Sequence, residues 1–324
     1  MIVFAGKTNE ERIVDGVLTS ADLNFDDVWL LENADGAPGP SAWTSLAITG
    51  PAPAGRHMHT AVYDLTNNRM IIFGGHVGSV FENDVWVLQN ANGLGGAPTW
   101  SKLAPAGTPP PVREWHSAIY DAATNRMIVF SGTTLDNEVW VLEQANGLGG
   151  TPAWSRLVVT GPAPIARRGH SAVYDGANNR MIVFGGRITG GLYPGDVWVL
   201  RNANGLGGAQ QWLELSPTGG APPAREDHRA VYNASENEML VFAGWRASPT
   251  DQYFNDVWVL SHANGLGGTP AWTELTPAGT APAKRELHSA VYNPGSDRMI
   301  AFGGSVTPTS MLNDVWILLN ATSE

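Results

Sequence analysis

A Val-Trp dipeptide preceded by an acidic residue recurs six times along the chain at an almost constant interval. The spacings between successive copies are 57, 54, 58, 60 and 58 residues, and the tryptophans are Trp29, Trp86, Trp140, Trp198, Trp258 and Trp316. A period of this length is typical of repeat proteins, in which each unit buries its apolar face against its neighbours. We therefore expect a single repeat domain over residues 1–324, and we look for function in the residues that the repeat does not explain.

The copy from Arg113 to Leu157 shows the segments of one repeat. It opens with REWHSAIYD, whose alternating apolar residues predict a strand. The run RMIVFSG is apolar on both faces, as expected of a strand that is covered on both sides. NEVWVL and AWSRL follow as two further strands, with glycine and asparagine at the tight connections. Because no segment keeps a period of 3.6 residues, we predict an all-β protein.

The second and third segments resemble the kelch repeat. The runs RMIIFGG, RMIVFGG and RMIAFGG precede NDVWVL, GDVWVL or NDVWIL, and a W-x-x-L strand follows most copies. The resemblance covers nearly the whole chain and implies one four-stranded propeller blade per repeat. The diglycine is AG or SG in the copies that contain Gly6, Gly132 and Gly244. We do not expect this change to disturb the fold, because alanine and serine add little bulk.

We predict a six-bladed kelch-type β-propeller, with five closed blades plus an extra two-strand flap as the alternative. The predicted blades cover approximately residues 1–46, 56–103, 113–157, 167–215, 225–275 and 285–320, and the first and last have three strands. An incomplete seam between those two blades would expose strand edges, which can pair with another chain. Dimerisation, strand exchange or capture of an extended peptide at the seam is therefore a further expectation.

Composition limits the classes of function. The chain has a net charge of −11, which argues against a sequence-independent grip on nucleic acid phosphates. It contains no cysteine, so disulfides and thiolate chemistry are excluded and the redox compartment is undetermined. We find no apolar run of membrane-spanning length and no basic, apolar signal segment at the start. These observations predict a soluble protein of undetermined localisation.

Aromatic residues outside the repeat register indicate a binding surface. Eleven of the thirteen tryptophans keep the register and are expected in the core, whereas Trp115 and Trp245 do not. Trp115 precedes a first strand and Trp245 follows a second strand, and in an antiparallel blade these two loops emerge on the same face. Tyr193, Tyr253, Phe81 and Phe254 also lie in second-to-third loops. Aromatic residues gathered on one face predict a ligand surface, and the resemblance implies the same location.

Each complete first strand begins with R-x-x-H, and we interpret these arginines and histidines as structural because five copies surround the ring. The two residues between them vary, as expected of a tuned site within a fixed frame. We predict ligand contacts from this ring and from the residues after the second strands: Trp115, Trp245, Tyr193, Tyr253, His57, His76, Arg168, Arg187, Asp227 and Arg246.

Metal and phosphate sites are not predicted. His57 and His59 could join His76 or Glu114 around zinc, but His59 belongs to the repeated frame. The acidic residue before each Val-Trp also repeats and is interpreted as structural. The ANGLGG segments join two strands with no helix after them, so they lack the helix N-terminus that a phosphate loop uses. No cofactor is expected, and the copper cofactor of galactose oxidase, which contains kelch repeats, needs a cysteine.

Three functions remain open. We favour a binding module that holds a carbohydrate or a peptide by aromatic stacking and by hydrogen bonds from arginine and carboxyl groups. The alternative is an enzyme that resembles the kelch sugar epimerases, in which Glu114, Glu226 and Glu286 act as acids or bases and His57 or His76 carries a proton. The third is a protein-interaction scaffold without a small-molecule site.

Overall fold

The computed structural model describes the backbone of residues 1–14, 17–247, 250–307 and 309–321, and the side chains of these residues apart from residues 9–22. Parts of the predicted first, fifth and sixth blades therefore lie outside the described residues. The described residues contain no helical segment with the length and apolar character that a membrane crossing requires.

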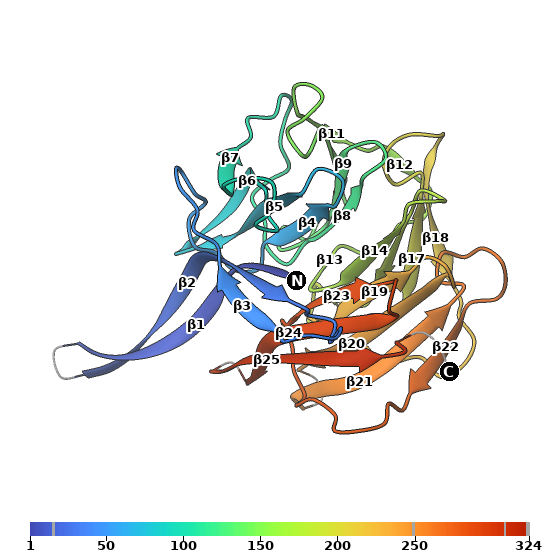
Figure 1. The fold of residues 1–324 in the computed structure, drawn as a ribbon. Helices are drawn as coiled ribbons and strands as arrows, with labels where there is room; N and C mark the ends of the chain where they lie inside the picture. The colour runs from blue at the N-terminus through green and yellow to red at the C-terminus, as the bar shows by residue number, and fades with distance from the viewer. Residues whose placement is uncertain (15–16, 248–249, 308, 322–324) are drawn as a thin grey trace.

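Six antiparallel sheets follow one another along the chain and surround a common centre (Figure 1). The first has three strands: β1 (Ile2–Val14), β2 (Val17–Glu32) and β3 (Ala42–Ser45). The last also has three: β23 (Ser289–Asn293), β24 (Arg298–Thr307) and β25 (Ser310–Leu319). The prediction of a six-bladed propeller is confirmed, and the alternative of five blades with a flap is wrong.

The four middle blades each have four strands in sequence order from the centre outwards. The second and third blades consist of β4 (Thr60–Asp64), β5 (Arg69–Val77), β6 (Val80–Gln89), β7 (Thr99–Lys102), β8 (Ser117–Asp121), β9 (Arg126–Phe130), β10 (Val139–Glu143) and β11 (Ala153–Arg156). The fourth and fifth consist of β14 (Ser171–Asp175), β15 (Arg180–Phe184), β17 (Val197–Arg201), β18 (Gln210–Leu215), β19 (Arg229–Asn233), β20 (Glu238–Arg246), β21 (Gln252–Ser261) and β22 (Ala271–Leu275).

Three short strands add to this frame near the fourth blade. β12 (Val159–Thr160) pairs in parallel with the outer strand β18. β13 (Arg167–Arg168) pairs with β16 (Arg187–Ile188), where Arg168 is the register partner of Arg187. The residues before the first strand are thereby held against the loop that follows the second strand.

The core consists of apolar clusters between consecutive blades. In one of them, Trp198 and Trp212 of the fourth blade pack with Ile128 and Phe130 of the third. Five such clusters of buried side chains join the first blade through to the sixth. The second strands are apolar on both faces because a neighbouring blade covers each face.

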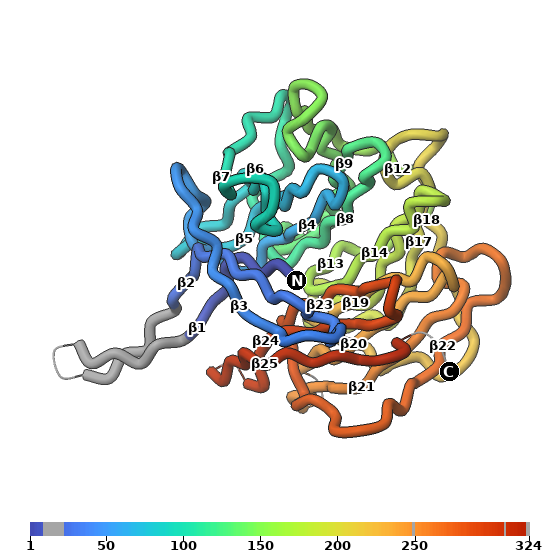
Figure 2. The backbone as a smooth tube through the Cα atoms, in the orientation of Figure 1, coloured from blue at the N-terminus to red at the C-terminus, as the bar shows by residue number. Residues whose placement is uncertain are grey.

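The junction between the last and first blades reuses the polar contacts of the other junctions. Asn146 Nδ2 donates to Asp64 Oδ2 at 2.6 Å between the third and second blades. At the seam, Asn293 Nδ2 donates to Asp35 Oδ2 at 2.8 Å, and the Arg298 guanidinium donates to the Asp35 carbonyl. The ring therefore closes with the same blade-to-blade geometry, and β3 lies beside β24 and β25 (Figure 2).

Apolar packing at the seam differs from the expectation that all eleven register tryptophans are buried. Trp29 is 37% exposed and Trp43 is 38% exposed, whereas Trp198 is 7% exposed. The Trp43 ring contacts Phe302 with a centroid distance of 5.1 Å. Because the first and last blades have only three strands each, less apolar surface covers these two indoles.

The pattern of intact and degenerate diglycines has a structural reason. The first position adopts a positive φ, which Ala5, Ser131 and Ala243 also tolerate. At the second position the backbone approaches the histidine of R-x-x-H: a Cβ added to Gly75 would lie 2.7 Å from the Cβ of His59. In the second to sixth blades a side chain at this second position would collide with the histidine segment, so glycine is required there, whereas a Cβ on Gly6 of the first blade would meet no atom within 4 Å.

Candidate functional site

The R-x-x-H arginines are structural, as the sequence predicts. Arg167 is fully buried, and its guanidinium donates to Asp196 Oδ1 at 2.6 Å, to Asp196 Oδ2 at 2.8 Å and to the Gly185 carbonyl at 2.9 Å. Asp196 also accepts from Trp198 Nε1 at 2.8 Å. Burial opposes ionisation of Asp196, but the bonds and charge of Arg167 outweigh it and hold its pKa below the usual value. The acidic residue before Val-Trp holds both an arginine and a tryptophan in four blades, at Asp84, Asp196, Asp256 and Asp314.

Three of the five R-x-x-H histidines form hydrogen bonds with the neighbouring blade. His116 Nε2 lies 2.9 Å from Thr60 Oγ1, His170 Nε2 lies 2.8 Å from Ser117 Oγ, and His228 Nε2 makes the same contact with Ser171. Burial, followed by the charge of the neighbouring Arg167, lowers the pKa of His170 to about 3. These imidazoles are neutral at physiological pH and hold the ring together.

Backbone hydrogen bonds join five blades around the centre of the ring. The residues at the third position of R-x-x-H all have positive φ, and in the third to sixth blades the amide of this residue donates to the carbonyl of the equivalent residue in the preceding blade. This series, which we name the collar, runs through Met58, Trp115, Gly169, Asp227 and Leu287. The collar is a main-chain floor, and the side chains that vary between blades lie on and around it.

Aromatic and cationic side chains gather beside the collar on the fourth and fifth blades. Trp245 contacts Tyr193 edge to face with a centroid distance of 6.4 Å, and its ring lies 6.3 Å from that of Tyr253. The Tyr193 hydroxyl accepts from the Ala247 amide at 3.1 Å, while the Arg187 guanidinium lies 5.8 Å from the Tyr193 ring. All three aromatic rings are half-buried, so they are held in place and remain reachable.

A second aromatic and cationic contact lies between the third and fourth blades. The Arg168 guanidinium lies over the Trp115 ring at 4.6 Å. The buried Glu226 carboxylate lies between two arginines, with Oε2 4.0 Å from Arg168 Nε and Oε1 3.7 Å from Arg187 Nη1. Glu226 therefore links the Trp115 contact to the Tyr193 contact.

Three buried carboxyl groups lie on this part of the ring. Burial raises the pKa of Glu226, although Arg187 and Arg168 oppose the shift. Burial and then the charge of Glu226 raise the pKa of Glu286 to about 7. Burial, Glu226 and Glu286 raise the pKa of Asp227 well above its usual value. These carboxyls influence one another across blades, and at neutral pH they hold fewer negative charges than their number suggests.

On the second and third blades, two imidazoles and a carboxylate form a separate group. His57 and His76 are paired by backbone hydrogen bonds of 3.2 and 2.8 Å, and their rings lie 4.9 Å apart. His76 Nδ1 lies 3.2 Å from Glu114 Oε2, and His57 Nδ1 lies 2.8 Å from Asn24 Oδ1. One ligand atom from each of His57, His76 and Glu114 lies within 4.8 Å of the others, an arrangement that could hold a metal ion.

The comparisons with known proteins agree with the propeller fold. Residues 95–201 and 134–324 match the family described as the KLHDC2/KLHL20/DRC7 Kelch-repeats domain, so the match extends over more than half of the chain. The chain belongs to the kelch-repeat family.

Curated kelch relatives are similar over part or most of the chain. Host cell factor 2 from Homo sapiens is 28% identical over 236 residues, which cover 68% of this chain and 27% of that protein. The serine/threonine-protein phosphatase BSL2 from Arabidopsis thaliana is 28% identical over 66% of this chain and 20% of its own length. Kelch domain-containing protein 3 from Bos taurus is 26% identical over 86% of this chain and 71% of its own. The chain spans less than a third of the first relatives.

Solved structures share the fold. YjhT superposes with a TM-score of 0.65 at 15% identity, covering 90% of this chain and 88% of that chain. A fungal alcohol oxidase of the AA5 family, in complex with copper, gives a TM-score of 0.55 at 17% identity, covering 90% of this chain and 57% of that chain. At these identities the likeness concerns the propeller alone.

Within this kelch propeller, the predicted ligand residues fall into two groups. The first group lies on the third to fifth blades and consists of Trp115, Arg168, Arg187, Tyr193, Asp227, Trp245, Arg246 and Tyr253. The second group consists of His57 and His76 on the second blade. Of the candidate acids, Glu226 belongs to the first group, Glu286 of the sixth blade lies close enough to interact with it, and Glu114 belongs to the second group. Their role as a binding site stays a prediction.

One aromatic side chain differs from the sequence interpretation. Phe254 is 6% exposed and lies 4.0 Å from the buried Arg225 guanidinium, so it is a structural residue. His59 does not belong to the group of His57, His76 and Glu114, as expected of a residue of the repeated frame, and burial lowers its pKa to about 3. Sequence reasoning missed Asn24 and Ser305, which contact His57 and Glu286. Ser305 of β24 occupies the repeat position that His76 of β5 and Arg187 of β16 occupy in other blades, directly after the diglycine, so the repeat pattern contained the signal.

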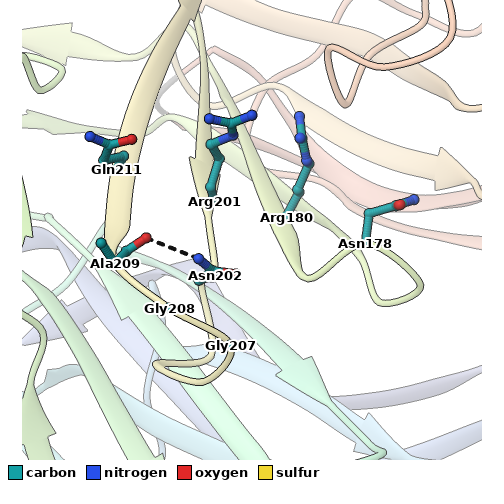
Figure 3. Close-up of a pocket in the computed structure, with 8 residues that line it drawn as sticks. All are labelled: Asn178, Arg180, Arg201, Asn202, Gly207, Gly208, Ala209 and Gln211. Carbon is teal, nitrogen blue, oxygen red and sulfur yellow. Dashed lines mark hydrogen bonds between the residues drawn. The ribbon is translucent and has the colours of Figure 1, made fainter.

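Two hollows open elsewhere on the molecule. One, of about 320 Å³, lies at the seam and is lined by residues that include Met1, Leu31, Val291 and Ile300. The other, of about 400 Å³, lies between the turn after β14 and the loop before β18 (Figure 3). These connections emerge at the strand ends opposite to R-x-x-H, so the second hollow belongs to the opposite face of the ring.

Proposed function

We propose that this kelch propeller binds an extended peptide segment of a partner protein on the face that carries the collar. The observation that carries the proposal is the half-buried cluster of Trp245, Tyr193 and Tyr253 around Arg187, next to the buried Glu226. Aromatic rings with a few fixed polar groups are typical of binding surfaces. The relatives support the proposal, because most match this chain over a minor part of their length, as expected of a module within a larger protein.

The polar groups suit a peptide backbone and its side chains. Arg187 and Arg168 can donate to carbonyl or carboxylate oxygens, and their planar guanidinium groups fix the direction of the bonds. A carboxyl group that is protonated near neutral pH can donate to a carbonyl as well, and the pKa of Glu286 is raised to about 7. Apolar side chains of the peptide would pack on the aromatic cluster. The site therefore offers donors and apolar surface side by side.

Selection from a phage-displayed peptide library, followed by affinity measurement, tests this proposal. We expect peptides with micromolar dissociation constants, and we expect Trp245→Ala and Arg187→Ala each to weaken them about 10-fold or more. Arg156→Ala is the matched control, because Arg156 is 60% exposed on the outer strand β11 and should not affect binding. Selected peptides that bind both variants as tightly as wild type would contradict the proposed location of the binding site. A selection that yields no binding peptide would contradict the proposal that the ligand is a peptide.

A carbohydrate is the alternative ligand for the same residues, since sugar rings stack on indole and their hydroxyls bond to arginine and carboxyl groups. A panel of neutral and acidic sugars, screened beside the peptides with the same variants, separates the two ligands. If a sugar binds in a manner that depends on Trp245 and no peptide binds, the ligand of the site is a sugar and the proposed location of the site is unchanged.

A second candidate function is acid–base catalysis on a sugar, favoured by the raised pKa values of Glu226 and Glu286. Carboxyl groups that titrate near neutral pH are suited to proton transfer. Incubation of the sugar panel in D₂O tests it by proton NMR. The candidate requires exchange of a carbon-bound hydrogen that is lost in Glu286→Gln, and wild-type protein that exchanges no hydrogen in any sugar of the panel would exclude it for that panel.

The seam could hold a second copy of the chain. β23 has Val291 at 40% exposure, whereas the equivalent Val173 is 7% exposed, and the adjacent hollow of about 320 Å³ is partly apolar. The first and last sheets have three strands each, and the strand edges that they leave uncovered favour pairing with another chain. Light scattering after gel filtration tests this: a dimer that Val291→Lys converts to a monomer is expected, and a monomeric wild type would contradict it.

A further inference from the structure

The opposite face of the fourth blade places two arginines directly across from each other. Arg180 of β15 is the register partner of Arg201 of β17. Side chains at directly opposed positions lie on the same face of the sheet, and like charges there repel. Arg180 is 7% exposed and Arg201 is exposed to solvent. Burial and then the charge of Arg201 lower the pKa of Arg180.

Neighbouring blades provide a neutral or acidic partner at the position of Arg201. In the second blade, Arg69 Nη2 donates to Gln89 Oε1 at 3.2 Å. In the third, Arg126 Nη2 donates to Glu143 Oε1 at 2.9 Å. The fold therefore brings the residues at the positions of Arg180 and Arg201 into contact distance in each of these blades. Of the second, third and fourth blades, only the fourth has a cation at both positions.

The carboxylate of Asp175, the register partner of Arg180 on β14, compensates only part of the positive charge of the pair. Neither Arg180 nor Arg201 forms an ion pair with any residue that the structure describes. Arg180 Nη1 donates to the Asn264 carbonyl at 2.7 Å. Asp175 is the buried carboxylate nearby, and it already accepts from the Ala177 and Asn178 amides and from the side chains of Asn178 and Asn264. In a chain of net charge −11, two such cations require an explanation.

Both arginines line the hollow of about 400 Å³, and Figure 3 shows their guanidinium groups side by side. The side-chain amides of Asn178 and Gln211 stand on either side of the pair (Figure 3). The loop at the end of the hollow is fixed by a bond of 2.9 Å from Asn202 Nδ2 to the Ala209 carbonyl. The hollow thus combines two guanidinium groups with two amides on rigid strands.

We infer that this hollow binds an oxyanion of the phosphate or sulfate class, held between Arg180 and Arg201 with amide groups from Asn178 and Gln211. Guanidinium groups recognise such anions through paired hydrogen bonds. In the second and third blades Gln89 and Glu143 face the equivalent arginines, so no two cations oppose each other there. In the fourth blade the bound anion would compensate the charge of the second cation. It is either a free ion or a group carried by a larger ligand. The site is on the face opposite to the proposed peptide surface and does not depend on that proposal.

Thermal unfolding in inorganic phosphate, at an ionic strength matched with sodium chloride, tests the inference. Wild type should gain on the order of 2 °C in its midpoint at ten times the dissociation constant. Arg201→Gln and Arg201→Glu reproduce the second and third blades. Both should melt higher than wild type in chloride alone, because the repulsion is removed, and both should lose the gain from phosphate. Arg156→Ala, outside the hollow, should keep it.

Sulfate and a phosphoserine peptide, compared with the same peptide without phosphate, distinguish the source of the anion. A phosphopeptide that binds through Arg201 more tightly than inorganic phosphate indicates a group carried by a partner, and equal binding indicates a free ion. Phosphate that raises the midpoint equally in wild type and in Arg201→Glu, or no more than chloride does, would overturn the inference.

Discussion

The contact between Arg167 and Asp196 should contribute more stability than its equivalent in the third blade. Asp196→Ala leaves a fully buried guanidinium without its carboxylate and removes the acceptor of Trp198 Nε1. Loss of one partner of a buried pair costs about 3–5 kcal/mol, and the lost indole bond adds about 1 kcal/mol. Asp196 is 23% exposed, so water partly relieves the loss. We expect a total of about 3–4 kcal/mol.

The matched control is Asp136→Ala in the third blade. Arg113 makes one contact with Asp136 at 3.2 Å, and Trp140 Nε1 donates to Glu138 instead. The expected loss is about 1–2 kcal/mol, because the charge of Glu138 still stabilises the buried Arg113 guanidinium when Asp136 is removed. Urea unfolding at pH 7, with unchanged dependence on urea, measures both variants. Equal losses, or a loss below about 1 kcal/mol for Asp196→Ala, would refute the reasoning.

Three further predictions concern pH, the collar and the seam. The pKa of Glu286 is raised to about 7, so the folded state favours its protonated form and stability should fall as pH rises from about 4.5 to 7. Thermal unfolding should show a smaller fall in Glu286→Gln than in wild type. The same pH profile for both proteins would contradict the raised pKa. In Gly169→Ala the new Cβ would lie 2.9 Å from Asp227 Oδ1 at a φ of +61°. Chemical denaturation should therefore show a free energy of unfolding lower by about 1–3 kcal/mol. An unchanged free energy would mean that the collar adapts to the new side chain. Asp35→Ala removes the bond from Asn293 at the seam and should lower the midpoint of chemical denaturation, whereas an unchanged midpoint would indicate that the seam contact is not formed in solution.

The repeat made most of the fold predictable. Six copies of one pattern specify six sheets, and the strands apolar on both faces indicate blades packed on both sides. The frame of buried arginines and histidines was also predictable, because residues repeated in every blade are explained by contacts between repeats. The exposure of Trp29 and Trp43 was not, since it depends on how much surface two three-stranded blades can cover.

Only part of the candidate site was accessible from the sequence. Departure from the repeat register singled out Trp245 and Tyr193, which do lie in contact. The same rule failed for Phe254, because burial against Arg225 depends on the path of the loop. Coupling between Glu226 and Glu286, and the opposition of Arg180 to Arg201, depend on strand register and blade spacing, which a one-dimensional pattern does not specify.

Hydrogen–deuterium exchange with a selected peptide is the most direct test of the proposed binding surface. The account predicts slower amide exchange in the peptide complex over residues 187–195, 245–247 and 250–253, with little change in the loop at residues 202–209 on the opposite face. Protection confined to that opposite loop, or to the seam, would contradict the central claim.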